Sequence, residues 1–136
     1  MKIVDLNEEE VSDIESRLEA YDDSRMHFRM DGCIQIGIEE DGQLVAGLDA
    51  CMTAFRILYV STLFVNEEYR RKGYGTALVR EMEARAAEMG ATVIRLDTFD
   101  WQGKEFYEAL GYETVGHYEN RQEGYAEYFF LKRLTR

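Results

Sequence analysis

The order of apolar and polar positions predicts a chain that mixes strands and helices. Residues 57–65 read Ile-Leu-Tyr-Val-Ser-Thr-Leu-Phe-Val, a nearly unbroken apolar run rich in strand-forming residues, which predicts a strand buried on both faces. Before it, apolar residues alternate over residues 34–38 and again over residues 44–50, with Asp41-Gly42 between them. This pattern predicts a β-hairpin. A second turn near residues 52–54 leads into the apolar run, so we expect three strands in a meander.

A helix and a further strand follow. Leu78, Met82, Ala86 and Met89 recur on one helical face, and Gly90 stands where that helix would end. The next apolar segment, residues 91–99, predicts a strand. Because this strand follows a helix that itself follows a strand, we expect a parallel crossover connection between the two strands.

The two ends of the chain complete the predicted layout. Residues 102–110 predict a short helix that stops at Gly111, and residues 112–118 and 125–134 predict an antiparallel hairpin at the end of the sheet.

At the N-terminus, residues 3–6 predict a short strand and Asn7 has the chemistry of an N-cap for a helix to about Ala20. Residues 25–29 are ambiguous between a second short helix and a loop. Repeats and linkers are absent from the sequence, so we expect one α/β domain over residues 1–136.

The segment from Val65 to Thr76 carries the clearest chemistry. It joins the apolar strand to the helix and contains three consecutive basic residues followed by Gly73 and Gly75. A loop that opens a helix presents unpaired backbone N–H groups and the positive end of the helix dipole. Glycines without a Cβ atom let a phosphate approach the backbone closely. We therefore predict a site for a phosphate-bearing ligand.

Two common phosphate-binding motifs do not fit this loop. A P-loop requires Gly-Lys-Ser/Thr after its spacer, whereas Lys72 precedes Gly73 here. A dinucleotide fingerprint requires a third glycine where Leu78 stands, and its glycines should follow the strand directly. The three-strand meander before the loop also differs from a nicotinamide-binding half-domain, although Asp97 lies near the expected position of a ribose-binding acid.

The loop instead resembles a known signature. Arg70-x-x-Gly73-x-Gly75 after a buried strand is similar to the acetyl-CoA signature of the GNAT superfamily of N-acetyltransferases, written Gln/Arg-x-x-Gly-x-Gly/Ala. Residues 106–112, Phe-Tyr-Glu-Ala-Leu-Gly-Tyr, resemble the second signature of that superfamily. The resemblance is specific over residues 57–115. It implies a GNAT-like, mixed and partly splayed β-sheet flanked by helices, with acetyl-CoA or CoA as co-substrate and no metal.

The resemblance also implies roles for individual residues. The backbone of three strand residues would hydrogen-bond the pantetheine arm in the gap between the splayed strands: Leu63, Phe64 and Val65. The loop and helix N-terminus would hold the pyrophosphate through backbone N–H groups and positive charge: Arg70, Arg71, Lys72, Gly73, Tyr74, Gly75 and Thr76. Tyr107 occupies the position of the tyrosine that, in many members, protonates or hydrogen-bonds the leaving thiolate. A core tyrosine with a satisfied hydroxyl is the structural alternative.

The residue that accepts the amine proton is left open. Ser61 and Thr62 stand where an acidic residue is expected on the strand of residues 57–65. Asp97 and Asp100 are the nearest carboxylate candidates, and His117 is a further one. At position 100 many members carry asparagine. A substrate amine that arrives partly neutral needs no dedicated base.

The composition of the chain limits the kinds of molecule that we expect it to bind. The net charge of −11, from 27 acidic and 16 basic residues, argues against nucleic acid. The negative charge has two explanations: it steers a cationic amine toward the protein, or it only keeps the protein soluble. The sequence shows neither a membrane-length apolar run nor a signal-peptide pattern, so we expect a cytoplasmic protein. For Cys33 and Cys51 we favour reduced core residues over a disulfide.

Two functions from different classes remain. The first is transfer of acetyl from acetyl-CoA to a primary amine, on a small molecule or a protein, by direct attack in a ternary complex. The second is a non-catalytic CoA-binding or regulatory module, which Ser61 and Thr62 motivate. His27, Phe28 and Arg29 would lie on the acceptor side of the cleft, and exposed edge strands allow a homodimer.

Overall fold

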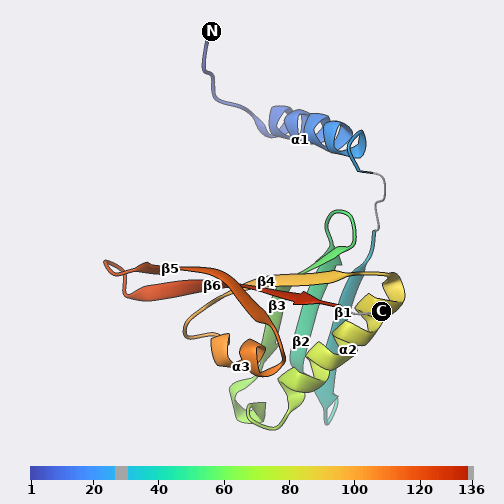
Figure 1. Ribbon diagram of the computed structural model, residues 1–136, viewed down its shortest axis with the longest axis vertical. Coiled ribbons are helices and arrows are strands. Elements are labelled where there is room, and N and C mark those ends of the chain that lie inside the picture. The colour runs from blue at the N-terminus through green and yellow to red at the C-terminus, as the bar shows by residue number, and fades with distance from the viewer. Residues whose placement is uncertain (27–30, 135–136) are drawn as a thin grey trace.

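The computed structural model describes residues 1–26 and 31–134 and contains one six-stranded sheet with helices (Figure 1). In chain order the elements are α1 (Glu8–Asp23), β1 (Cys33–Glu40), β2 (Gln43–Met52), β3 (Ile57–Val65), the 3-10 turn η1 (Glu67–Tyr69), α2 (Tyr74–Met89), β4 (Val93–Phe99), α3 (Lys104–Ala109), β5 (Glu113–Asn120) and β6 (Tyr125–Arg133). The sheet order is β1-β2-β3-β4-β6-β5. The predicted mixed α/β fold, with its meander and terminal hairpin, is confirmed.

The β1–β2 hairpin forms where the sequence predicts it. Asp41 and Gly42 both adopt positive φ angles, 53° and 77°, which is the backbone of the tight hairpin turn that Asp-Gly favours. The hairpin places Ile34, Ile36 and Ile38 on the face that packs against the core. Local turn chemistry and alternation therefore fix this half of the sheet.

The parallel strands β3 and β4 pair only at one end. Their register joins Ile57–Tyr59 to Val93–Arg95 and then stops, so the two strands diverge beyond Tyr59. A bulge accompanies the divergence, because Asp49 of β2 pairs with Thr62 and the next residue pairs with Val60, leaving Ser61 unmatched. An extra residue in one strand bends that strand and increases its twist. The expected partial splay is present.

The core lies on one face of the sheet, under α2 and α3. Leu78, Val79, Met82 and Ala86 are the buried residues of α2, and they join a single cluster with sheet residues such as Phe130. Gly90 ends α2 with a φ of 94°, a left-handed conformation in which glycine is not strained. This packing fixes the direction of α2 and so the position of its N-terminus.

Three predictions about secondary structure and burial need correction. Residues 3–6 are not a strand, because they precede α1 without pairing to the sheet. Asn7 caps α1 as predicted and forms a capping box with Glu10, but the helix continues to Asp23. The strand β3 is not buried on both faces, because Ser61, Thr62 and Phe64 are exposed. The prediction for residues 25–29, including His27, Phe28 and Arg29, falls largely outside the described residues.

The prediction of reduced core cysteines is also wrong. Cys33 and Cys51 stand directly opposite each other on β1 and β2 and form a disulfide. Cys33 is exposed and Cys51 is half-buried. The sequence suggested core positions because both residues lie in strand patterns, but the register places them on the face away from Ile34, which is buried.

Candidate active site

The N-terminus of α2 is prepared for an anion. Within the described residues, none of the six backbone N–H groups from Arg71 to Thr76 donates a hydrogen bond to the protein. Gly73 is the N-cap and offers no side-chain acceptor, and the first turn of α2 contains no acidic residue. In α1, by contrast, Asn7 caps the helix and three glutamates fill the first turn. Free amides and an unopposed helix dipole make this end of α2 suited to a phosphate group.

The shape of the loop depends on positive backbone angles. Arg71 has a φ of 61° and Gly73 a φ of 86°, so the backbone is left-handed at two positions just before the helix begins. Gly75 serves a different purpose. A Cβ atom there would lie 3.2 Å from Cζ of Phe106, so glycine allows α3 to approach the start of α2.

The three basic residues of the loop have different surroundings. Arg70 is used within the protein, because its Nε donates to the Val65 carbonyl oxygen at 2.8 Å and its guanidinium lies 5.2 Å from the ring centre of Phe64. This arrangement ties the loop to the end of β3. Arg71 lines the cavity described below, whereas Lys72 does not. The Lys72 ammonium lies 5.5 Å from the ring centre of Tyr69.

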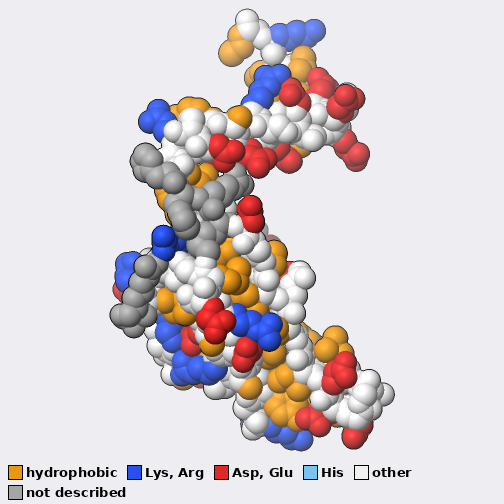
Figure 2. All heavy atoms as spheres, turned by 90° about the vertical axis from the view of Figure 1, so that its right-hand side faces the viewer, with side chains coloured by type: hydrophobic (Ala, Val, Ile, Leu, Met, Phe, Trp, Pro, Cys, Tyr) orange, Lys and Arg blue, Asp and Glu red, His pale blue; other side chains and the backbone are white. Residues whose placement is uncertain are grey.

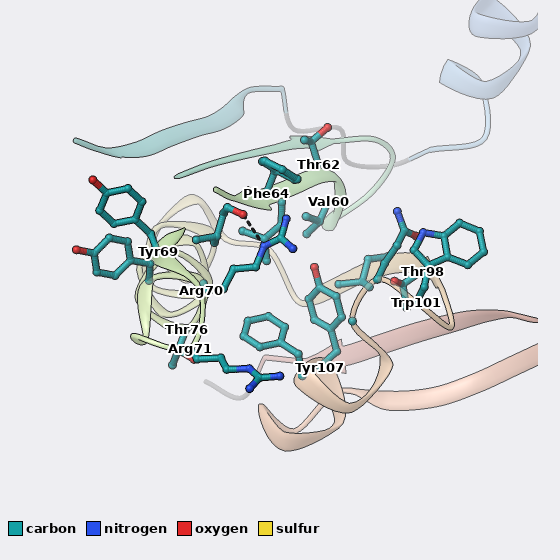
Figure 3. A pocket seen from close by; sticks show the side chains of 18 of the residues that line it. Val60, Thr62, Phe64, Tyr69, Arg70, Arg71, Thr76, Thr98, Trp101 and Tyr107 are labelled. Atoms are coloured by element: carbon teal, nitrogen blue, oxygen red, sulfur yellow. Dashed lines mark hydrogen bonds between the residues drawn. The ribbon is translucent and has the colours of Figure 1, made fainter. Parts of the chain in front are cut away.

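A cavity of about 750 Å³ occupies the gap between β3 and β4 (Figure 3). Its walls come from both faces of the sheet. Gly75 and Thr76 of α2 and Tyr107 of α3 lie on the covered face, while Thr62 and Asp97 belong to the opposite, uncovered face. The cleft therefore passes through the sheet and gives a ligand on the α2 side access to one on the other side.

All but one of the predicted site residues line this cavity. The structure brings together Leu63, Phe64, Val65, Arg70, Arg71, Gly73, Tyr74, Gly75, Thr76 and Tyr107. The exception is Lys72. Beyond Tyr59, β3 has no β4 partner, so backbone groups along one edge of residues 63–65 are available to a ligand.

Tyr107 presents its hydroxyl to the cavity. Its ring is buried, with 8% of its surface exposed, and packs edge-on against Phe106 and Tyr112 with ring centres 5.1 and 5.6 Å away. The hydroxyl has no hydrogen-bond partner among the described residues and points toward β3 (Figure 3). Burial raises the pKa of the Tyr107 phenol to about 12. At neutral pH the group is therefore a protonated donor.

The carboxylate candidates are separated by the structure. Asp97 lines the cavity, and its Oδ2 accepts a hydrogen bond from the Tyr59 hydroxyl at 3.0 Å. Burial, followed by this hydrogen bond, raises the pKa of the Tyr59 phenol. Asp100 instead accepts from the backbone N–H of Ala126 at 3.2 Å and holds the loop after β4. Asp97 is thus the carboxylate that can meet a ligand.

His117 and Trp101 differ from what the sequence suggests. His117 is stacked on Tyr128, with ring centres 5.7 Å apart, and does not line the cavity. Trp101 does line it, with 68% of its surface exposed, and stacks on Phe99 at 4.7 Å. Sequence reasoning overlooked Trp101. Its signal is a single tryptophan in the loop that directly follows the strand bordering the cleft.

Known proteins of similar sequence are acetyltransferases. The Acetyltransferase (GNAT) family model matches residues 2–112. The chain is 30% identical over 96 residues to blasticidin-S acetyltransferase of Streptomyces morookaense, and this alignment covers 70% of each protein.

Solved structures share the fold. The crystal structure of an acetyltransferase from Bacillus cereus ATCC 14579 superposes with a TM-score of 0.93 at 30% identity and covers 98% of both chains. An aminoglycoside 6'-N-acetyltransferase complexed with coenzyme A superposes with a TM-score of 0.65 at 23% identity, covering 76% of this chain and 74% of that one. The second similarity concerns the fold alone.

Proposed function

The chain belongs to the GNAT family of acetyltransferases, and we propose that it transfers acetyl from acetyl-CoA to a primary amine by direct attack within a ternary complex. One observation carries the proposal. The free amides at the start of α2, the unpaired edge of β3 and the Tyr107 hydroxyl all border the same through-sheet cavity. An anion site, an amide-binding edge and a hydrogen-bond donor, in that order, match the pyrophosphate, the pantetheine arm and the thioester of acetyl-CoA.

The pyrophosphate binds at the N-terminus of α2. The amides of residues 71–76 supply hydrogen bonds, and Arg71 and Lys72 supply charge. Arg70 acts mainly by holding the loop to Val65. The pantetheine arm runs along residues 63–65, where its amide groups replace the missing strand partner. This path brings the thioester to the middle of the gap.

At the thioester, the amine nitrogen attacks the carbonyl carbon, the C–S bond breaks, and the sulfur leaves as a thiolate. Tyr107 donates a hydrogen bond to that sulfur. Full proton transfer from a phenol of pKa about 12 to a thiolate whose acid has a pKa of ~8.5 is uphill by ~5 kcal/mol. Tyr107 therefore stabilises the thiolate without releasing its own proton. Water relays the proton that the amine loses to the leaving sulfur.

The acceptor amine enters from the uncovered face. Asp97 lies there at the cavity wall, and its carboxylate binds an ammonium and orients the nitrogen after deprotonation. A small-molecule acceptor is favoured, because a relative that covers most of this chain is named for acetylation of blasticidin S. Trp101, which is exposed and lines the same cavity as Asp97, supplies an apolar wall for the rest of the acceptor.

A non-catalytic CoA-binding module is the second candidate. The observation that favours it is the absence of an acidic residue on the cavity-facing part of β3, where Ser61 and Thr62 stand. Such a module would bind CoA through the same loop but would release no thiol with any amine.

Ligand-dependent melting tests the cofactor, and thiol release tests the reaction. We expect acetyl-CoA and CoA, but neither NAD nor ATP, to raise the melting temperature. A ligand at about 100 times its dissociation constant stabilises the fold by ~2.7 kcal/mol, which is several degrees for a domain of this size. An amine panel that includes blasticidin S and an aminoglycoside then follows thiol release. Stabilisation without release from any amine would favour the binding module, and no stabilisation would reject both functions.

A further inference from the structure

The first 26 residues form an arm that stands off the sheet. Figures 1 and 2 show α1 beyond the end of the sheet that carries the β2–β3 turn. No residue of α1 is buried. Besides Met1, the arm exposes seven apolar side chains, with 41% to 91% of their surfaces accessible: Ile3, Val4, Leu6, Val11, Ile14, Leu18 and Tyr21.

The exposed apolar side chains of α1 form a stripe of the kind that a helix packs against another surface. Val11, Ile14, Leu18 and Tyr21 recur at spacings of three and four residues, which aligns them on one side of α1. Isolated helices of this length are marginal in water, and most helical stability in proteins comes from packing such a face. Ser16 lies on the opposite side of α1. We therefore expect another protein surface to cover the stripe.

Among the described residues, no helix covers the other face of the sheet. Its strand register aligns Cys33, Cys51, Tyr59, Arg95 and Leu131 in one row across β1, β2, β3, β4 and β6. Residues two positions along the strands share this face and include Gln35, Asp49, Asp97 and Phe129. Gln35, Arg95, Asp97 and Phe129 are exposed, whereas the opposite face is buried under α2.

The arm's course agrees with that of a crystallised relative. The 110 residues outside the arm are about 0.81 of the 136-residue chain, so their superposition alone yields a TM-score of at most about 0.81. The value for the Bacillus cereus acetyltransferase is 0.93. Much of the arm therefore lies in the same place in both proteins, directed away from its own sheet.

We propose that the arm of one copy packs across the uncovered sheet face of a second copy, and that the second copy reciprocates. A two-fold dimer satisfies both surfaces at once, because each chain carries the apolar stripe and the bare sheet. Within one chain, none of the described residues buries the stripe on α1 or the exposed residues of the bare sheet face.

The exchanged arm would lie next to the cavity between β3 and β4. Thr62, Phe64 and Asp97 line the cavity from the uncovered face, so an arm laid on that face walls the end of the cavity where the acceptor enters. Each cleft is then completed by the partner's arm. The contact between arm and sheet does not depend on the acetyl-transfer reaction, so a chain without this contact could still transfer acetyl.

Mass in solution is the first test. Sedimentation velocity of the full chain at micromolar concentration should give twice the 15.9 kDa of one chain. Ile14→Lys should weaken the dimer by about 100-fold, as loss of a buried interface anchor does. Ser16→Lys, the same change on the opposite side of α1, should leave it intact. Phe129→Lys tests the receiving face. A monomeric wild-type chain, or a dimer indifferent to Ile14→Lys, overturns the proposal.

Cross-linking distinguishes exchange from folding back. A photoreactive phenylalanine analogue at position 14 is incorporated into heavy-isotope and light copies, which are mixed as monomers, allowed to associate and irradiated. Exchange predicts cross-linked peptides that join a heavy arm to a light sheet, at β3, β4 or β6. Links only between peptides of the same label mean that each arm covers its own sheet, and they reject the exchange. This readout does not depend on how well any charged variant folds.

Discussion

Replacing Tyr107 with phenylalanine isolates the proposed donor from its packing. The substitution keeps the ring that contacts Phe106, Tyr112 and Phe130 with centres 5.1 to 5.9 Å away. It removes only a hydroxyl that bonds to none of the described residues. Because no internal hydrogen bond is lost, the melting temperature at neutral pH should stay within about a degree or two of wild type, in keeping with a stability change under ~0.5 kcal/mol.

The effect on turnover follows from the charge on the leaving sulfur. A hydrogen bond to a charged group contributes ~1.5–3 kcal/mol, and each 1.36 kcal/mol changes the rate tenfold. Tyr107→Phe should therefore lower kcat by roughly 10- to 150-fold. The thioester sulfur of bound acetyl-CoA carries little charge, so the dissociation constant of the cofactor should change by less than about twofold.

Thiol release measured with a chromogenic disulfide reagent reports kcat, and calorimetric titration reports CoA affinity. Tyr112→Phe is the matched control. Its ring also packs against Tyr107, but its hydroxyl donates to Glu83 Oε2 at 2.9 Å inside the protein. We expect Tyr112→Phe to lose stability, because a hydrogen bond to the half-buried Glu83 carboxylate is removed, and to keep kcat near wild type.

The two variants should thus show opposite profiles. A Tyr107→Phe enzyme with unchanged kcat would remove this hydroxyl from the mechanism. A large loss of CoA affinity in the same variant would instead assign the hydroxyl to ground-state binding, which is also contrary to the reasoning.

Three further outcomes are expected. Gly73→Ala and Gly124→Ala both place a side chain at a positive φ with open space around it, so each should lower the free energy of unfolding, measured with denaturant, by ~1 kcal/mol. Only Gly73→Ala should also weaken CoA binding, by about 10-fold. The Tyr107 pKa rises on folding to about 12, so the contribution of this residue to the free energy of unfolding is present below pH ~10 and lost between pH ~10 and ~12. Over that window, the free energy of unfolding of the phenylalanine variant should fall by up to ~2.7 kcal/mol less than that of wild type. Reducing the Cys33–Cys51 disulfide, which closes a loop with a sequence separation of 18, should lower the free energy of unfolding by up to ~3 kcal/mol and the melting temperature by several degrees.

Local chemistry made much of the fold predictable. The β1–β2 hairpin follows from alternation and Asp41-Gly42, and α2 ends at Gly90 because glycine adopts a left-handed conformation there. The anion-binding loop was predictable for the same reason, since glycines and basic residues between a strand and a helix define it without long-range information. Grouping Tyr107 with that loop depended on resemblance to a family, because the two segments are far apart in the sequence and meet through tertiary packing, such as that of Phe106 on Gly75.

Features set by register or by tertiary packing were not predictable. The apolar content of residues 57–65 suggested burial on both faces, but a bulge at Ser61 and the lack of a covering helix leave Thr62 and Phe64 exposed. The disulfide depends on Cys33 facing Cys51 across two strands, which no spacing rule shows. Likewise, Asp97 and Asp100 have equal claims in the sequence, and only the direction of each side chain separates them.

The splay of β3 and β4 links stability to chemistry in this protein. A fully paired parallel ladder would extend past Tyr59, but pairing stops there, and beyond it the edge of β3 that faces β4 has no strand partner. Such groups are costly where they are dry, so they suit a water-filled gap that an amide-bearing ligand can enter. In the proposed reaction, a cofactor held at α2 and an amine held near Asp97 would approach from opposite faces of the sheet and meet beside Tyr107, because residues of both faces line the gap. Ser61, the bulged residue of β3, lies just beyond the last residue that pairs with β4 and lines the cavity itself.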